Sequence, residues 1–187
     1  MRLISSFVLG YHGCSAKTRN ALLGGKAFHA SANDYDWLGH GIYFWEANPE
    51  RGLQWAKQHG LARPCAVGAV IEPGECLDLF SAAGIKAVRT AYQELTRASR
   101  QAGTPMPCNA GGSDCLRRSL DCAVIEYLFR ITDSHYDTVR GIFREGDPIY
   151  PTSGFYAKTH IQICVRNSRC IKGVFRVAAA VTRATKR

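Results

Sequence analysis

Short segments rich in β-branched and aromatic residues occur at the start, in the middle and at the end of the chain, with helical segments between them. This order restricts the possible folds strongly, because strands that are distant in the sequence have to share a core. It predicts an α+β domain in which sheets pack on each other with helices at the side. We expect strands at residues 4–11, 42–45, 65–71, 136–143, 158–165 and 171–177.

Capping residues locate the first two helices. Ser15 is a suitable N-cap for a helix over residues 16–23, and a pair of glycines ends that helix. Asn48 caps a second helix, which has Pro49 in its first turn and reaches about residue 59. Each helix therefore follows directly after an expected strand.

One segment rich in proline and glycine, residues 103–112, interrupts the pattern. Before it, a third helix covers residues 82–100, and after it a fourth helix is capped by Ser113 or Asp114 and ends at residue 129. We interpret the segment as a surface loop rather than a domain boundary, because neither half of the chain completes the sheet alone. The 187 residues thus correspond to a single domain, 1–187. The apolar positions with helical spacing in the third helix are Ile85, Val88, Tyr92 and Leu95.

The chain is basic, with 24 Lys and Arg residues against 15 Asp and Glu residues and a net charge of +9. Such a surface attracts polyanions, including nucleic acid. A solvated basic face without such a partner is an equally good interpretation. With 46% hydrophobic and 21% charged residues, the composition is that of a folded protein and not of a disordered one.

Eight cysteines are present, and three of them, Cys108, Cys115 and Cys122, recur at seven-residue intervals. No CxxC pair accompanies them, so we expect reduced thiols and no metal site. The sequence contains no stretch near the ~20 apolar residues of a membrane span, and its start is too mixed for a signal peptide. We therefore expect a cytoplasmic protein with no membrane partner.

Two motifs carry most of the functional information. Residues 11–15, Tyr-His-Gly-Cys-Ser, stand at the end of the first expected strand, and residues 39–44, Gly-His-Gly-Ile-Tyr-Phe, follow some thirty residues later. In order and spacing this pair resembles the motifs of the poly(ADP-ribose) polymerase and diphtheria-toxin group of ADP-ribosyltransferases. The resemblance implies an ADP-ribosyltransferase-like split β-sheet core with flanking helices, and NAD⁺ as the substrate.

The first motif implies one side of an NAD⁺ site. His12 would hydrogen-bond a hydroxyl of the adenosine ribose, since either imidazole nitrogen can do so. Gly13 would offer backbone groups to the nicotinamide carboxamide, because glycine permits close approach of a ligand. Cys14 and Ser15 belong to the same NAD⁺-binding segment.

The second motif and the helix after it imply the nicotinamide slot. Tyr43 would stack on the nicotinamide ring. Trp55 would form the second wall of the slot, although a core tryptophan is an equally good interpretation. The sequence departs from the family pattern at Arg51, which stands near the position of a carboxamide-binding serine.

The third catalytic position also differs from the family pattern. The family carries a glutamate on a late strand, where it stabilises the developing positive charge of the ribose. Here the matching position is Gln162, which can orient a hydroxyl but has no charge. Glu145, Asp147 and Glu46 are the alternative carboxylates, and loss of catalysis is a further alternative.

These features favour NAD-dependent mono-ADP-ribosyl transfer to a protein or nucleic-acid acceptor. A small transferase of this kind would suit a bacterial toxin or a phage-defence effector, with a neutralising antitoxin as a partner. NAD glycohydrolase activity, a tRNA 2′-phosphotransferase-like reaction using His40 or His160, and a non-catalytic NAD, ADP-ribose or nucleic-acid binding module are the alternatives. The acceptor-binding residues would be Arg144, Tyr150, Phe155, Tyr156 and Lys158.

Overall fold

Seven strands of the chain join in one sheet in the computed structural model, which describes residues 6–111, 116–132 and 135–178. The strand order across the sheet is β4-β7-β8-β2-β1-β3-β9. All neighbours pair antiparallel except β4 and β7, which are parallel. The strands are β1 (Val8–Ser15), β2 (Ile42–Glu46), β3 (Pro64–Ile71), β4 (Cys76–Asp78), β7 (Thr138–Phe143), β8 (His160–Val165) and β9 (Ile171–Arg176).

The fold is mixed α+β, as the sequence predicted, but the expectation of separate sheets packed on each other is wrong. The two halves of the sheet are continuous through β1 and β2, which pair at only two positions, Gly10 with Glu46 and Tyr11 with Trp45. Beyond that point β1 continues beside β3 without β2 as a neighbour. The sheet is therefore joined at its centre by a short contact and opens next to it.

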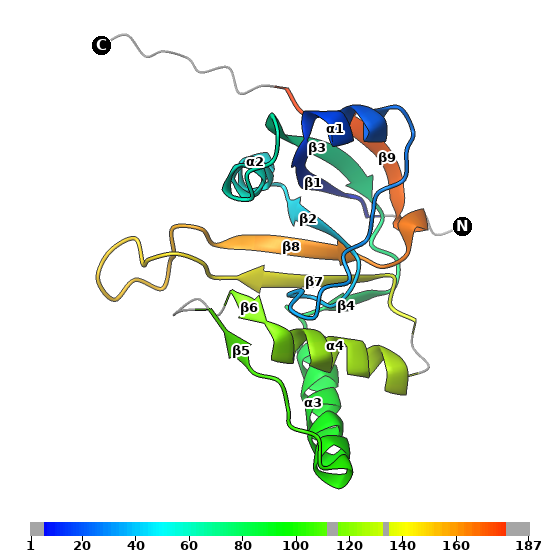
Figure 1. The fold of residues 1–187 in the computed structure, drawn as a ribbon, viewed down its shortest axis with the longest axis vertical. Coiled ribbons are helices and arrows are strands. Elements are labelled where there is room, and N and C mark those ends of the chain that lie inside the picture. The colour runs from blue at the N-terminus through cyan, green and yellow to red at the C-terminus, as the bar shows by residue number, and fades with distance from the viewer. Residues whose placement is uncertain (1–5, 112–115, 133–134, 179–187) are drawn as a thin grey trace.

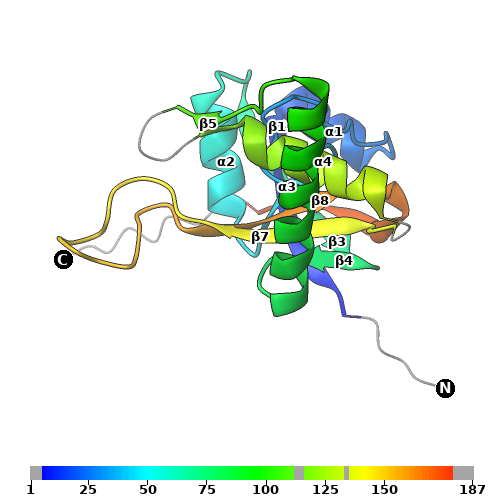
Figure 2. The ribbon, with the colours of Figure 1, turned by 90° about the horizontal axis from the view of Figure 1, so that it is seen from below.

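Four helices cover the two halves of the sheet (Figure 1). Helix α1 (Ala16–Leu23) and helix α2 (Pro49–Gln58) pack beside β1 and β3, while α3 (Ala82–Ala102) and α4 (Ser119–Ile131) pack on each other near β4 and β7. Figure 2 shows that the segment between β7 and β8 extends away from the body of the molecule. Among the helices of the described residues, none combines the length and apolar character needed to cross a bilayer.

The predicted caps of the first two helices are confirmed. The Ser15 hydroxyl accepts a hydrogen bond from the backbone N–H of Thr18 at 3.1 Å, and the Asn48 side chain accepts one from that of Arg51 at 3.0 Å. These bonds satisfy N–H groups that have no partner within the first helical turn. Both helices therefore begin where the sequence predicted.

The fourth helix begins later in the chain than the sequence predicted. The predicted caps Ser113 and Asp114 lie outside the described residues, and α4 begins at Ser119. The predicted loop also contains part of a two-stranded ribbon, β5 (Asn109–Ala110) paired with β6 (Arg117–Arg118). Neither this ribbon nor β4 was predicted, since segments of two or three residues are too short to show a pattern.

The first strand extends further than predicted. We expected residues 12 and 13 to end it, whereas β1 continues to Ser15 with β3 paired along its whole length. Residues 4 and 5 of the predicted strand lie outside the described residues. His12 and Gly13 are consequently strand residues, with alternating side-chain directions.

Two apolar clusters lie on opposite faces of β2. Successive residues of a strand point to opposite faces, so Phe44 is buried in one cluster while Tyr43 packs against the other. The cluster on the side of α3 and α4 contains Leu38, Leu77, Ala91, Val124, Ile125, Leu128, Val139, Phe143 and Cys164. The other contains Ile42, Phe44, Ala69, Ile71, Ile163, Val165 and Cys170.

Candidate functional site

A cleft of about 680 Å³ lies where β1 and β2 separate. Strands β1, β2 and β8, helix α2 and the segment 29–37 contribute to its lining. The cleft brings together five residues that the sequence analysis selected from distant segments: His12, Gly13, Tyr43, Trp55 and Gln162.

His12 lies at the point of separation. Its Nδ1 is 2.9 Å from the backbone carbonyl oxygen of Tyr43, and its ring packs against Phe28 and Phe44. A carbonyl oxygen can only accept, so Nδ1 carries the proton and Nε2 of the neutral ring is an acceptor. Burial lowers the pKa of His12, although its hydrogen bond to Tyr43 opposes this shift. The imidazole is therefore neutral at pH 7 and can accept a hydrogen bond from a ligand.

Gly13 lies where helix α2 approaches β1 closely. A Cβ atom at this position would clash with the backbone carbonyl oxygen of Gly52 and would lie 3.1 Å from the Trp55 ring. The absence of a side chain thus has a packing reason in addition to the role that the resemblance implies. It lets the helix lie directly against the floor of the cleft.

The phenol of Tyr43 is fixed by the backbone of the segment before β2. Its hydroxyl donates to the carbonyl oxygen of Gly39 at 2.6 Å and accepts from the N–H of Leu38 at 2.8 Å. Burial raises the pKa of Tyr43 well above its usual value. The hydroxyl therefore stays protonated, and the aromatic ring is the part of this side chain that can serve a ligand.

The other two residues that the resemblance assigned to NAD⁺ binding, Cys14 and Ser15, do not line the cleft. Cys14 is buried in a small cluster with Leu22 and Val67. Burial raises the pKa of its thiol to about 12, so it is not a nucleophile at pH 7. Ser15 caps α1. The structure gives both residues a packing or capping role.

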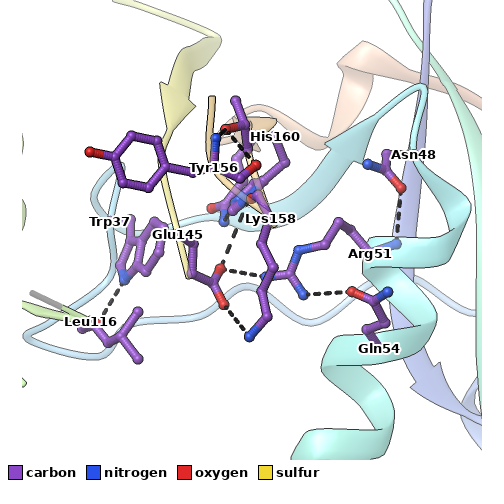
Figure 3. A network of polar contacts seen from close by, with 11 residues as sticks. Trp37, Asn48, Arg51, Gln54, Leu116, Glu145, Tyr156, Lys158 and His160 are labelled. Carbon is purple, nitrogen blue, oxygen red and sulfur yellow. Dashed lines mark hydrogen bonds and ion pairs between the residues drawn. The ribbon is translucent and has the colours of Figure 1, made fainter. Parts of the chain in front are cut away.

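Among the three alternative carboxylates, Glu145 is the one that lines the cleft. It follows β7 and ion-pairs with Arg51 of α2 at 2.5 Å and with Lys158 at 3.4 Å (Figure 3). Glu145 and Arg51 are both more than nine-tenths buried. The sequence analysis noted Arg51 only as a departure from the family pattern, because nothing in the sequence links it to a residue 94 positions away.

The remaining two carboxylates have other positions. Glu46 accepts two hydrogen bonds from Arg140, at 2.6 and 2.9 Å, and does not line the cleft. Asp147 is exposed in the projecting segment between β7 and β8. Neither of these two faces Gln162 across the cleft.

Two buried donors beside the cleft lack a protein partner. Within the part of the chain that the structure describes, the indole Nε1 of Trp45 and the Nε of Arg51 are buried and have no hydrogen-bond partner. Both residues line the cleft, and the guanidinium carbon of Arg51 lies 6.0 Å from the centre of the Trp45 ring. An unpaired buried donor costs about 1–3 kcal/mol, so both groups reduce the stability of this part of the protein.

Trp55 stacks on His59 of the same helix region, with ring centres 4.1 Å apart, and lies 5.9 Å from the Trp45 ring. It is half-buried and lines the cleft. Both interpretations from the sequence, a core tryptophan and a wall of the cleft, therefore apply to Trp55 in part.

One wall of the cleft comes from the loop at residues 29–37, which belongs to neither of the two motifs. The buried carboxylate of Asp36 accepts hydrogen bonds from the Ser31 hydroxyl at 2.9 Å and from the Asn33 N–H at 3.0 Å. These bonds fold residues 31–36 into a fixed turn beside Tyr43. This role of Asp36 cannot be recognised from the sequence, because Asp and Asn are common in loops of every kind.

The segment between β7 and β8 projects from the body of the molecule (Figures 1 and 2). It exposes three large apolar side chains, Ile149, Tyr150 and Phe155, each more than half exposed. The Arg144 guanidinium lies over the Tyr156 ring at 5.1 Å. The segment thus presents apolar and cationic groups next to the cleft.

Comparison with known proteins found no matching family model, no matching curated protein and no matching solved structure. Functional inference therefore depends on the geometry of the cleft.

Proposed function

We propose that the chain binds NAD⁺ in the cleft, cleaves the bond between nicotinamide and ribose, and transfers ADP-ribose to a macromolecular acceptor. The observation that carries this proposal is that His12, Tyr43 and Gln162 line the same cavity, although they come from three different strands. On this proposal the separation of β1 from β2 corresponds to the split core of ADP-ribosyltransferases.

The chemistry of each side chain suits a dinucleotide. His12 offers a neutral Nε2 acceptor to a ribose hydroxyl, and Tyr43 offers a ring whose hydroxyl is already engaged. Trp55 supplies a second aromatic surface of the same cavity. Holding the nicotinamide in one orientation within such a cleft is the main contribution that a protein makes to cleavage of this bond.

The third position determines how strongly the protein can stabilise a positive charge on the ribose. The ribose becomes positively charged as nicotinamide leaves, and a nearby carboxylate stabilises it more than an amide does. Gln162 supplies an amide, and Glu145, a carboxylate that lines the cleft, shares its charge with Arg51 and Lys158. This arrangement supports transfer of a single ADP-ribose unit rather than elongation of a polymer.

The acceptor is proposed to contact the projecting segment between β7 and β8. Its exposed aromatic and apolar side chains, together with Arg144, suit either a protein surface or the bases and phosphates of a single-stranded nucleic acid. Reaction products distinguish these two acceptor classes.

The direct test is incubation of the purified chain with cell lysate and NAD⁺ labelled in its adenylate phosphate. Transfer predicts release of nicotinamide and a label that precipitates with macromolecules. Sensitivity of that label to protease or to nuclease then identifies the acceptor class. Absence of both NAD⁺ binding and nicotinamide release would overturn the proposal.

Two substitutions test the assignment of residues. His12→Ala and Tyr43→Ala each remove one polar contact or one stacked ring, so binding or turnover should fall by about ten- to a hundredfold. The matched controls are His135→Ala and Tyr92→Ala, since both side chains are exposed outside the cleft. Normal turnover in both cleft variants would refute the assignment.

A non-catalytic NAD⁺ or ADP-ribose binding module is the second candidate. It is favoured by the amide at position 162 and by the ion pairs of Glu145. NAD⁺ binding without nicotinamide release identifies this function, and nicotinamide release without labelled macromolecules identifies hydrolysis. Gln162→Glu should keep or raise cleavage if transfer is correct.

A further inference from the structure

His160 lies directly beneath the cleft and has no role in the function proposed above. It stands two positions before Gln162 on β8, so both side chains point to the same face of the sheet. The ring is buried between Trp37 and Phe143, with centres 6.0 Å from each. Figure 3 shows it beside Glu145 and Lys158 at the edge of the polar network.

The hydrogen bonds of His160 define which nitrogen carries the proton. Nδ1 lies 2.6 Å from the backbone carbonyl oxygen of Lys158. Because a carbonyl oxygen only accepts, Nδ1 is the donor, and Nε2 of the neutral ring is left with its lone pair. Nε2 lies 2.8 Å from the amide nitrogen of Gln162. The amide N–H therefore donates to Nε2.

This bond determines the orientation of the Gln162 side chain. With the amide nitrogen held by His160, the amide oxygen is the polar atom available to a ligand in the cleft. An oxygen in this position accepts hydrogen bonds and cannot donate them. The reversed amide would place two N–H donors there instead.

We propose that His160 is a positioning residue whose Nδ1–H tautomer fixes Gln162 so that its amide oxygen receives a hydroxyl group of the ligand. This inference depends on the proposed function for the identity of that hydroxyl, which is on the ribose attached to nicotinamide. The orientation of the amide itself depends only on the chain.

The surroundings of His160 favour the neutral form of its ring. Arg51 from α2 and Arg118 from β6 disfavour protonation of the His160 ring, while Glu145 after β7 favours it. Burial is the largest effect and lowers the pKa of His160, and the hydrogen bond from Nδ1 to the Lys158 carbonyl only partly opposes this shift. A neutral ring is the state in which Nε2 can accept from Gln162.

The first experiment uses the free protein and requires no activity. Nitrogen-15 NMR of the histidine side chains should show the Nδ1–H tautomer for His160. In Gln162→Glu the carboxylate accepts from a protonated Nε2, so the pKa of His160 should rise by about one unit or more. Gln93→Glu on the exposed face of α3 is the control and should leave His160 unchanged. An Nε2–H tautomer in the wild type, or a pKa that Gln162→Glu does not move, would overturn the inference.

The second experiment measures NAD⁺ cleavage. His160→Phe keeps an aromatic ring between Trp37 and Phe143 but releases the amide, so kcat should fall about tenfold with a smaller change in KM. Adding Gln162→Glu should restore kcat, because a carboxylate presents an acceptor oxygen in either orientation. Failure of this rescue contradicts a positioning role. If NMR shows the expected tautomer and the wild type neither binds nor cleaves NAD⁺, the proposed function fails while the amide orientation stands.

Discussion

Two side chains of the cleft, His12 and Tyr43, have one polar atom bound to the backbone and one surface left for a ligand. The imidazole donates to the carbonyl of Tyr43 and keeps Nε2 free, while the phenol binds Leu38 and Gly39 and keeps its ring face. Such fixed side chains lose little freedom on binding, which favours affinity.

Tyr43→Phe separates the two roles of the tyrosine. Removing the hydroxyl leaves the buried N–H of Leu38 unpaired and the carbonyl of Gly39 with only the Cys164 thiol as a donor, so the free energy of unfolding should fall by about 1–3 kcal/mol. The ring remains, so NAD⁺ affinity at a temperature below unfolding should exceed that of Tyr43→Ala. Urea unfolding and equilibrium dialysis measure the two effects. Equal affinities in the two variants would show that the ring face does not bind the ligand.

Helix and strand positions depend on local signals that the sequence shows clearly. The N-caps Ser15 and Asn48 were predicted correctly because capping depends on a side chain and the next three residues. The apolar spacing of the third helix predicted the element and part of its buried face, since Val88 and Leu95 pack against the core. Ile85 and Tyr92 are exposed, whereas the small residues Gly84 and Ala91 are buried, because close packing of α3 selects small side chains.

Close packing of α2 on β1 gives a prediction at the scale of elements. In Gly13→Ala the new methyl group meets the backbone of Gly52, which cannot rotate away as a side chain can. Either the helix or the strand has to shift, and the protein should lose about 1–3 kcal/mol of stability. Thermal unfolding measures the loss.

Gly173→Ala on β9 is the matched control, since a Cβ there meets no atom within 4 Å. Its unfolding temperature should stay close to that of the wild type. An unchanged unfolding temperature in Gly13→Ala would mean that α2 lies farther from β1 than in this structure.

At the scale of the whole molecule, two buried histidines make stability depend on pH. Burial lowers the pKa of His12 and of His160 below the ordinary value of 6.5. Between the lowered and the ordinary value the unfolded chain binds more protons, so stability rises with pH. Their contribution is complete above pH 6.5 and is lost as the pH falls through the lowered values.

Urea unfolding should therefore give a smaller free energy at about pH 5.5 than at about pH 7.5. The acidic groups with lowered pKa values, Glu126 and Asp137, stay ionised across this range. Replacing both His12 and His160 with Phe should flatten the dependence, whereas His135→Gln should not. A wild-type stability that is constant across this range would contradict the burial of both neutral rings.

The sequence by itself determined the α+β class, the caps of the first two helices and the five residues that share the cleft. It could do so because caps, strand patterns and short motifs are properties of neighbouring residues. The continuous seven-stranded sheet, the turn organised by Asp36 and the pairing of Arg51 with Glu145 were decided by the tertiary structure. These features join residues far apart in the chain, and their partners are fixed only when burial brings them together and penalises every polar group left unpaired.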